Sequence, residues 1–218
     1  YLFSSILLLF KKRVIFITPW GSDINDAKGF KKIIINFFLK KAHTITTDSY
    51  IFYNEFLKLN TNTKLINFGI DTNFFKPDLS IEENIIICPR GFDEIYRPYT
   101  ILYAINKIKS KINNLNFIFL GNKNKNKKIL NYINDNKIHK IVSLHGSLDQ
   151  HAYLELLNKS KGMISASISD AGISSSIAEF MSCNKIIIAA NNSDNNHWIK
   201  DGVNGYLFKN DDINKLAE

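Results

Sequence analysis

Residues 162–190 read GMISASISDAGISSSIAEFMSCNKIIIAA. An apolar run follows the first glycine and leads into a polar loop that contains Asp170 and Gly172, and a helix-like segment then precedes a second apolar run at 185–190. This succession predicts a strand, a loop, a helix and a further strand. In an open parallel sheet, ligands bind at the carboxyl ends of the strands, where the free N–H groups of a helix N-terminus suit a phosphate. The three serines at 174–176 are expected at such a place.

Helical spacing predicts that the segment after this loop has two different faces, because successive residues turn by about 100°. The apolar face holds Ile177, Phe180 and Met181, and the small polar face holds Ser175, Ser176, Glu179 and Cys183. Glu179 would then approach a ligand from a surface without bulky neighbours. The simpler interpretation is a carboxylate that is only solvated, but the loop before the helix favours the ligand.

The same residues resemble a known family. The order of Ser-Asp, a glutamate, Phe-Met-Ser-Cys-Asn and an apolar strand is similar to the donor-site signature of the retaining GT-B glycosyltransferases of family 4. The two acidic residues, Asp170 and Glu179, are one position further apart than in that signature. Asn184 stands where the family usually has glycine, and asparagine is the next best residue for a left-handed helix end.

The resemblance implies roles for this loop and helix. Glu179 would hold the ribose hydroxyls of the donor, and Asp170, or a neighbour in its loop, would contact the donor sugar. The implied donor-binding loop also includes Gly172, Ile173, Ser174 and Ser175.

An arginine pair is the second candidate feature. Residues 84–88 predict a strand covered on both faces, and Arg90 follows it closely. In the family that the chain resembles, an arginine and a lysine in this loop hold the donor diphosphate, whereas this chain has Arg90 and, after a longer gap, Arg97. An arginine at a strand end can bind a diphosphate bidentately and stabilise the leaving group. We therefore expect both arginines to bind the donor and Arg90 to act with Asp170 in catalysis. The alternative is a pair of surface arginines.

An acceptor side is implied near the start of the chain. Residues 14–18 predict a strand, and Pro-Trp-Gly-Ser-Asp follows it. The segment resembles the acceptor-side strand and loop of the family, with tryptophan in place of the usual histidine, and so implies acceptor-side residues at Trp20, Gly21 and Asp23. Trp20 is either a stacking platform for a sugar or an aromatic residue that packs on the end of the sheet.

A segment in the first half of the chain indicates the domain organisation. Residues 67–77, NFGIDTNFFKP, closely resemble the interdomain segment of that family, and the phenylalanines would wedge between the domains. The predicted parts are 1–68, the C-terminal part of an acceptor-side Rossmann-like domain, 69–80, a linker, and 81–218, a donor-binding Rossmann-like domain truncated at its C-terminal end. Strands alternate with helices throughout, which predicts an α/β fold with parallel sheets. We expect a GT-B architecture with an incomplete first domain, and thus a fragment.

The composition limits the partners. The chain has 28 Lys and Arg against 20 Asp and Glu, a net charge of +8, which favours anionic partners such as nucleoside diphosphates or acidic membrane surfaces. The basic residues are scattered, so nucleic acid is not an expected partner. Residues 27–41 predict an amphipathic helix with lysines beside phenylalanines. This helix is either simply solvated on its charged side or meets an anionic membrane surface.

Two further patterns concern redox chemistry and membrane spans. Cys88 and Cys183 lie inside apolar segments, which predicts buried thiols and not a disulfide or a metal site. The apolar residues 1–10 are too few for a membrane span. We therefore expect a reducing cytoplasmic location, either without a membrane contact or peripheral on the inner face of the cytoplasmic membrane.

The resemblance implies a hexosyl- or N-acetylhexosaminyltransferase. It would move a sugar, with retention, from a UDP- or GDP-linked donor to a glycan or lipid-linked acceptor in bacterial surface polysaccharide assembly. No cofactor and no metal are expected, because the sequence has no Asp-x-Asp motif to hold a cation on the diphosphate. Two alternatives remain: a UDP-sugar epimerase of the same architecture, and a catalytically inactive fragment that binds nucleotide sugars.

Overall fold

The computed structural model of this chain describes residues 14–20, 23–24, 27–78, 83–112, 114–121, 126–170, 172–192 and 194–218. It divides into two compact units, and each is described by itself. The first comprises Tyr1–Gly69 and Asp170–Ile173, and the second comprises Ile70–Ser169 and Ser174–Glu218. Gly21, which the sequence suggests on the acceptor side, lies outside the described residues, as does the apolar segment 1–10.

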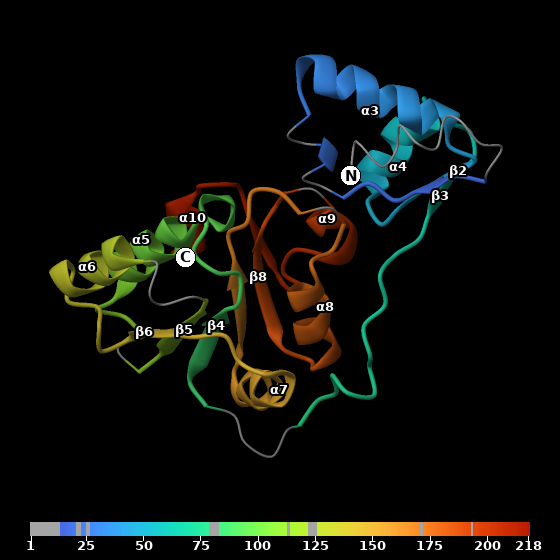
Figure 1. Cartoon of the computed structure of the whole chain (residues 1–218). Helices are drawn as coiled ribbons and strands as arrows, with labels where there is room; N and C mark the ends of the chain where they lie inside the picture. The colour runs from blue at the N-terminus through green and yellow to red at the C-terminus, as the bar shows by residue number, and fades with distance from the viewer. Residues whose placement is uncertain are drawn as a thin grey trace. The chain divides into compact units, whose positions relative to one another are not determined.

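The first unit holds a three-stranded parallel sheet with helices in the connections (Figure 1). The strands lie in chain order and are β1 (Phe16–Ile17), β2 (Thr44–Thr47) and β3 (Thr63–Leu65). The helices are α3 (Gly29–Lys41) and α4 (Tyr50–Leu57). A small core joins the two helices to the central strand and consists of Leu39, Ala42, Ile45, Phe52 and Phe56.

The second unit is built on a six-stranded parallel sheet with the strand order β6-β5-β4-β7-β8-β9. The strands are β4 (Ile85–Cys88), β5 (Asn116–Leu120), β6 (Val142–His145), β7 (Gly162–Ser165), β8 (Ile186–Ala190) and β9 (Tyr206–Phe208). The helices are the 3-10 helix η2 (Glu94–Tyr96), α5 (Pro98–Ile108), α6 (Lys127–Asp135), α7 (Gln150–Lys159), α8 (Ser175–Ser182), α9 (Asn195–Trp198) and α10 (Ile213–Leu216). This is the strand order of a doubly wound Rossmann fold. The predicted α/β fold with parallel sheets is confirmed.

Different helices cover the two faces of this sheet, because side chains alternate along each strand. Helices α5 and α6 pack on the face that carries Cys88, Phe117 and Phe119. Figure 1 shows these two helices next to each other and apart from α7 and α8. Helix α8 lies against β7 and β8, and Met163 and Ile187 are fully buried in these two strands. Both cysteines are buried and free, as predicted.

Part of the predicted linker is fixed on the second unit. Phe75 of this segment is buried, and its ring centroid lies 6.4 Å from that of Tyr153 in the second unit. Asn158 in α7 donates a hydrogen bond from Nδ2 to the carbonyl oxygen of Lys76 at 3.3 Å. It also accepts one from the N–H of Asp78 at 3.1 Å. This amide therefore holds the chain on α7 just before the second sheet begins.

Close packing between β7 and β8 requires a glycine at position 162. A Cβ atom added there would lie 2.2 Å from the carbonyl oxygen of Ile186, which is part of the backbone and cannot rotate away. Gly162→Ala should therefore lower the free energy of unfolding by about 1–3 kcal/mol, the usual effect of overpacking.

Chemical denaturation of the two proteins measures this difference. Gly146→Ala is the matched control, because a Cβ added at Gly146 meets no atom within 4 Å. Equal stabilities of the two variants would contradict the packing between β7 and β8.

Candidate functional site

The candidate site lies where β4 and β7 are neighbours in the middle of the second sheet. The chain leaves β4 toward α5 and leaves β7 toward α8, and these helices lie on opposite faces. Ligands of doubly wound folds bind outside the carboxyl ends of the strands at such a switch point. A small pocket is present here, and its lining includes Arg90, Tyr96, Ser165 and Ala166.

Arg90 is oriented by an aromatic ring. Its guanidinium carbon lies 4.7 Å from the centroid of the Tyr96 ring, within the range of a cation–π interaction. Tyr96 belongs to η2, the short helix that follows β4. The ring limits the rotamers of a long, half-buried side chain, so the positive charge is held near the end of β4.

Glu179, on α8, accepts a hydrogen bond at Oε2 from the phenol of Tyr153 at 3.0 Å. Partial burial raises the pKa of Glu179, because it disfavours the charged form, while the hydrogen bond from Tyr153 and the charge of Arg90 act in the opposite direction. Burial and the charge of Glu179 raise the pKa of Tyr153, so this phenol keeps its proton and remains a donor. The structure thus brings Arg90 and Glu179 into electrostatic range and adds Tyr153, which no sequence motif indicated.

The N-terminus of α8 is capped by the side chain of Ser174, the residue before the helix. Ser174 Oγ accepts a hydrogen bond from the N–H of Ile177 at 3.4 Å and lies 3.3 Å from Ser176 Oγ. Ser175, which begins the helix, is exposed. The predicted small polar face is therefore only partly open, because Ser176 and Cys183 are buried. The reason is packing: the thiol of Cys183 donates to the carbonyl oxygen of Lys76 at 3.5 Å.

The loop before this helix belongs in part to the first unit. Asp170 and Ile173 are buried there, and Gly172 has φ +68°, a left-handed conformation that glycine adopts readily. Asn184, after the helix, has φ +57°, as predicted for the residue in place of the family's glycine.

Arg97 has a different partner from Arg90. Its Nε lies 3.5 Å from Asp211 Oδ1, and the same carboxylate oxygen accepts a hydrogen bond from Thr100 Oγ1 at 3.0 Å. The backbone of Arg97 has a left-handed conformation, with φ +48°, and Arg97 precedes Pro98 at the start of α5. The contacts of Arg97 tie the start of α5 to the segment before α10.

Two of the predicted acceptor-side residues, Trp20 and Asp23, are joined by hydrogen bonds in the first unit. The N–H of Trp20 donates to Asp23 Oδ2 at 3.0 Å, and the N–H of Asp23 donates to the carbonyl oxygen of Trp20 at 2.9 Å. The ring centroid of Trp20 lies 5.1 Å from that of Phe68, and about half of each side chain is exposed, 51% and 49%. This pair presents an open aromatic surface after β1 and β3.

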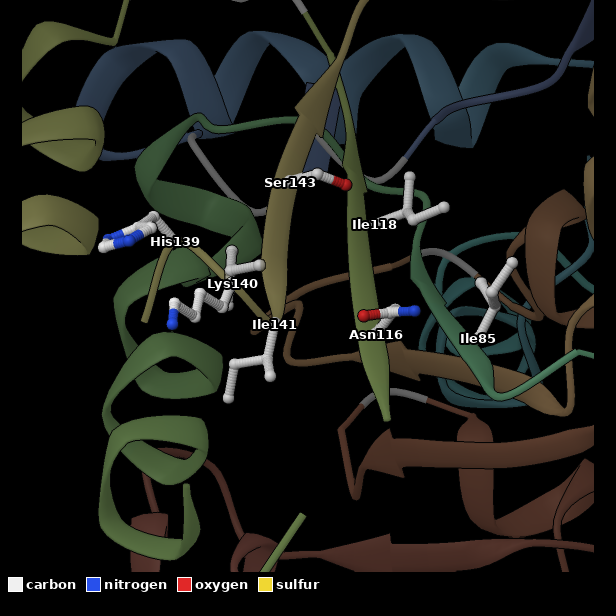
Figure 2. A pocket seen from close by; sticks show the side chains of 8 residues that line it. Ile85, Asn116, Ile118, His139, Lys140, Ile141 and Ser143 are labelled. Atoms are coloured by element: carbon white, nitrogen blue, oxygen red, sulfur yellow. The ribbon is translucent and has the colours of Figure 1, made fainter. Parts of the chain in front are cut away.

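A second hollow lies at the opposite ends of the strands of the large sheet. It is lined by the first residues of β4, β5 and β6, together with His139, Lys140, Ile141, Ile118 and Ser143. Figure 2 shows Asn116, Ile118 and Ser143 along the neighbouring strands β5 and β6. Because the strands are parallel, this hollow is at the amino ends, away from Arg90 and Glu179. Among the described residues, no group of three or more His, Cys, Asp or Glu side chains is arranged to hold a metal ion.

Comparisons with known proteins agree with this fold. The family model for glycosyl transferases group 1 matches residues 69–218. No curated protein sequence matches the chain significantly. Among solved structures, HepE from Anabaena, solved with UDP and glucose, superposes with a TM-score of 0.83 at 15% identity over 98% of this chain and 62% of its own.

Two further structures show the same similarity. Sucrose-phosphate synthase from Thermosynechococcus elongatus has a TM-score of 0.81 at 15% identity, over 100% of this chain and 61% of its own. A glycosyltransferase from Rickettsia africae has a TM-score of 0.79 at 18% identity, over 98% and 61%. The chain therefore spans less than two thirds of the length of these proteins. At such identities the similarity shows the fold alone, which is of the GT-B type.

The cap of α8 generates a prediction for stability. Ser174→Ala removes the oxygen that accepts from the N–H of Ile177 and should lower the free energy of unfolding by about 1 kcal/mol. Ser175→Ala, at the next and exposed position, should change it by less than about 0.5 kcal/mol. Thermal or chemical denaturation of both variants tests this, and a larger effect at Ser175 would show that the helix begins elsewhere.

Proposed function

Because the chain belongs to the family of glycosyl transferases group 1, we propose that it transfers a glycosyl unit from a nucleoside diphosphate sugar to a glycan or lipid-linked acceptor. The observation that carries this proposal is the pair formed by Arg90 and Glu179 at the switch point of the second sheet. UDP is the favoured nucleotide, because HepE, a structure with the same fold, was solved with UDP and glucose. GDP is the alternative.

Arg90 would bind the diphosphate and stabilise the charge that develops on it as the glycosidic bond breaks. A guanidinium can make two parallel hydrogen bonds to phosphate oxygens, and a positive charge there lowers the barrier to leaving-group departure. We propose that this happens without a metal ion and with retention at the anomeric carbon. Arg97 would join only by releasing Asp211, which lies 3.5 Å from its Nε.

Glu179 would accept hydrogen bonds from the ribose hydroxyls. A carboxylate has several acceptor positions on two oxygens, so the one bond from Tyr153 leaves room for a ligand. Asp170, or another residue of its loop, would contact the donor sugar. The loop residues Gly172, Ile173, Ser174 and Ser175 complete the proposed donor-binding set.

On the acceptor side we propose that Trp20, with Asp23 and the neighbouring Gly21, contacts the incoming hydroxyl-bearing molecule. The exposed aromatic surface of Trp20 and Phe68 supports this, because sugars stack their C–H faces on such rings. Assembly of bacterial surface polysaccharide is the process that we propose for this acceptor chemistry.

Calorimetric titration of UDP, UDP-glucose and GDP into the chain tests the donor site. We expect saturable binding of UDP, reduced by about ten- to a hundred-fold in Arg90→Ala, because hydrogen bonds to charged groups contribute about 1.5–3 kcal/mol each. Glu179→Ala should reduce it by about ten-fold for the same reason.

Glu155→Ala is the matched control. Glu155 is an exposed carboxylate on α7 that pairs with Lys159, and its loss should leave UDP affinity within about two-fold. Absence of nucleotide binding by the unaltered chain would refute the proposal, and release of free sugar from UDP-glucose without an acceptor would favour the epimerase.

We also propose that the first unit meets an anionic membrane surface through α3. Phe30, Ile33 and Phe37 are 76%, 66% and 46% exposed, and their spacing puts them on one face of the helix. Exposed lysines lie along the same helix, at positions 31, 32, 40 and 41. Apolar side chains beside lysines suit the boundary between acyl chains and anionic headgroups. None of the described helices combines the length and apolar content that a membrane span requires.

Co-sedimentation with vesicles tests this surface. The chain should bind vesicles that contain phosphatidylglycerol more strongly than pure phosphatidylcholine, and Phe30→Ser/Phe37→Ser should weaken binding by at least about ten-fold, since each buried phenylalanine contributes about 1.5–3 kcal/mol. Ile51→Ser, at an exposed position of α4, is the control. Equal binding of both vesicle types, or an unaffected double variant, would contradict the proposal.

A further inference from the structure

We propose that Tyr153 is a positioning residue of the donor site, which holds the carboxylate of Glu179 in the orientation that the ribose hydroxyls require. This inference rests on the proposed function, because it concerns the nucleotide that the site would bind. Tyr153 lies in α7, outside the loops and the helix whose sequence indicates a donor site.

The first support is the contact itself. The phenol oxygen of Tyr153 lies 3.0 Å from Glu179 Oε2, and a hydrogen bond to an ionised acceptor is among the stronger ones in proteins. Bonding through Oε2 restricts the orientation of the carboxylate and leaves Oε1 for a ligand. Glutamate has three rotatable bonds, so without this bond the carboxylate would have to be ordered when the nucleotide binds.

The second support is that the tyrosine ring is itself fixed. Its centroid lies 6.4 Å from that of Phe75 on the preceding segment and 6.4 Å from that of Phe180 on α8. Both rings meet it at steep angles, 75° and 64°, the edge-to-face arrangement that aromatic pairs prefer. The phenol therefore has little freedom of its own, and it can transfer the rigidity of the core to Glu179.

The third support is the charge environment of Glu179. The groups that act on the glutamate and tyrosine are Arg90 from the end of β4 and Cys183 after α8. Burial raises the pKa of Cys183 to about 11, so its thiol is neutral near pH 7. Of these two groups, both within the described part of the chain, only Arg90 is charged. Loss of the phenol donor would raise the pKa of Glu179 further, and a protonated carboxyl is a poorer acceptor for a ribose hydroxyl.

A tyrosine that only fills space would give a different result from one that positions Glu179. Tyr153→Phe keeps the ring and its contacts with Phe75 and Phe180 and removes only the hydroxyl. The effect of the hydroxyl can then be read from ligands that lack one ribose hydroxyl. A positioning role couples the phenol to the ribose, whereas a packing role would change the affinity for all nucleotides equally.

The experiment is a calorimetric comparison of UDP, 2′-deoxy-UDP and 3′-deoxy-UDP with the unaltered chain and with Tyr153→Phe. For the unaltered chain we expect UDP to bind about ten-fold more tightly than at least one deoxynucleotide. In Tyr153→Phe, UDP affinity should fall by about ten-fold and affinity for that deoxynucleotide by less than about two-fold, so that the preference is lost. An equal loss for all three ligands, or no loss, would overturn the inference.

Matched variants complete the test. Tyr206→Phe changes an exposed tyrosine on β9 and should leave every affinity unchanged. Arg90→Ala should weaken all three nucleotides alike, because they share the diphosphate. If Tyr153→Phe does not fold, Tyr153→His, whose shorter side chain ends short of Glu179 Oε2, removes the same donor and should also abolish the ribose preference; a retained preference in that folded variant would refute the positioning role. Failure of the unaltered chain to bind UDP would instead refute the proposed function.

The pH dependence gives an independent readout. Tyr153→Phe removes a hydrogen bond that lowers the pKa of Glu179, so the carboxyl of the variant takes up its proton at a higher pH. As the pH is lowered, UDP binding should therefore weaken earlier in the variant than in the unaltered chain. Burial raises the pKa of Cys183, so its thiol stays neutral and would not produce the shift. Identical acid limbs of the two binding curves would contradict the inference.

Discussion

The candidate site depends on the switch point between the parallel strands β4 and β7, where the order in which strands are added to the sheet reverses. These two strands are neighbours in the sheet, but their following helices lie on opposite faces, so neither helix covers the carboxyl ends of both strands. Arg90 follows one strand, and the loop that leads to Glu179 follows the other. Gly162, at the start of β7, leaves room for the carbonyl oxygen of Ile186 on the neighbouring strand β8.

A half-buried carboxylate is costly unless its surroundings offset the lost solvation. At Glu179 the offset comes from the phenol of Tyr153 and the charge of Arg90, and burial still has the larger effect on its pKa. The three side chains come from α8, α7 and the end of β4. Their arrangement therefore depends on the packing of the whole second unit, including Phe75, which precedes the sheet and contacts the tyrosine ring.

Local signals accounted for most of the elements. The alternation of apolar runs with helical spacing predicted the parallel α/β fold, and the strand at 185–190 is present as β8 (Ile186–Ala190). Prediction failed where packing between distant segments decides. Ser176, expected on the small polar face of α8, is buried, and its Oγ lies 3.3 Å from Ser174 Oγ. The first strand, expected at 14–18, has two paired residues, Phe16 and Ile17.

The sequence by itself determined the fold class and the left-handed helix end at Asn184, and it identified Arg90 and Glu179 as candidate ligand-binding residues, because spacing and motifs are local properties of the chain. The tertiary structure decided which of these side chains meet. It paired Arg97 with Asp211, brought Arg90 toward Glu179, and placed Tyr153 against that carboxylate. The physical reason is that these contacts join residues far apart in the chain, whose approach is set by the crossover of helices over the sheet and by the burial of their neighbours.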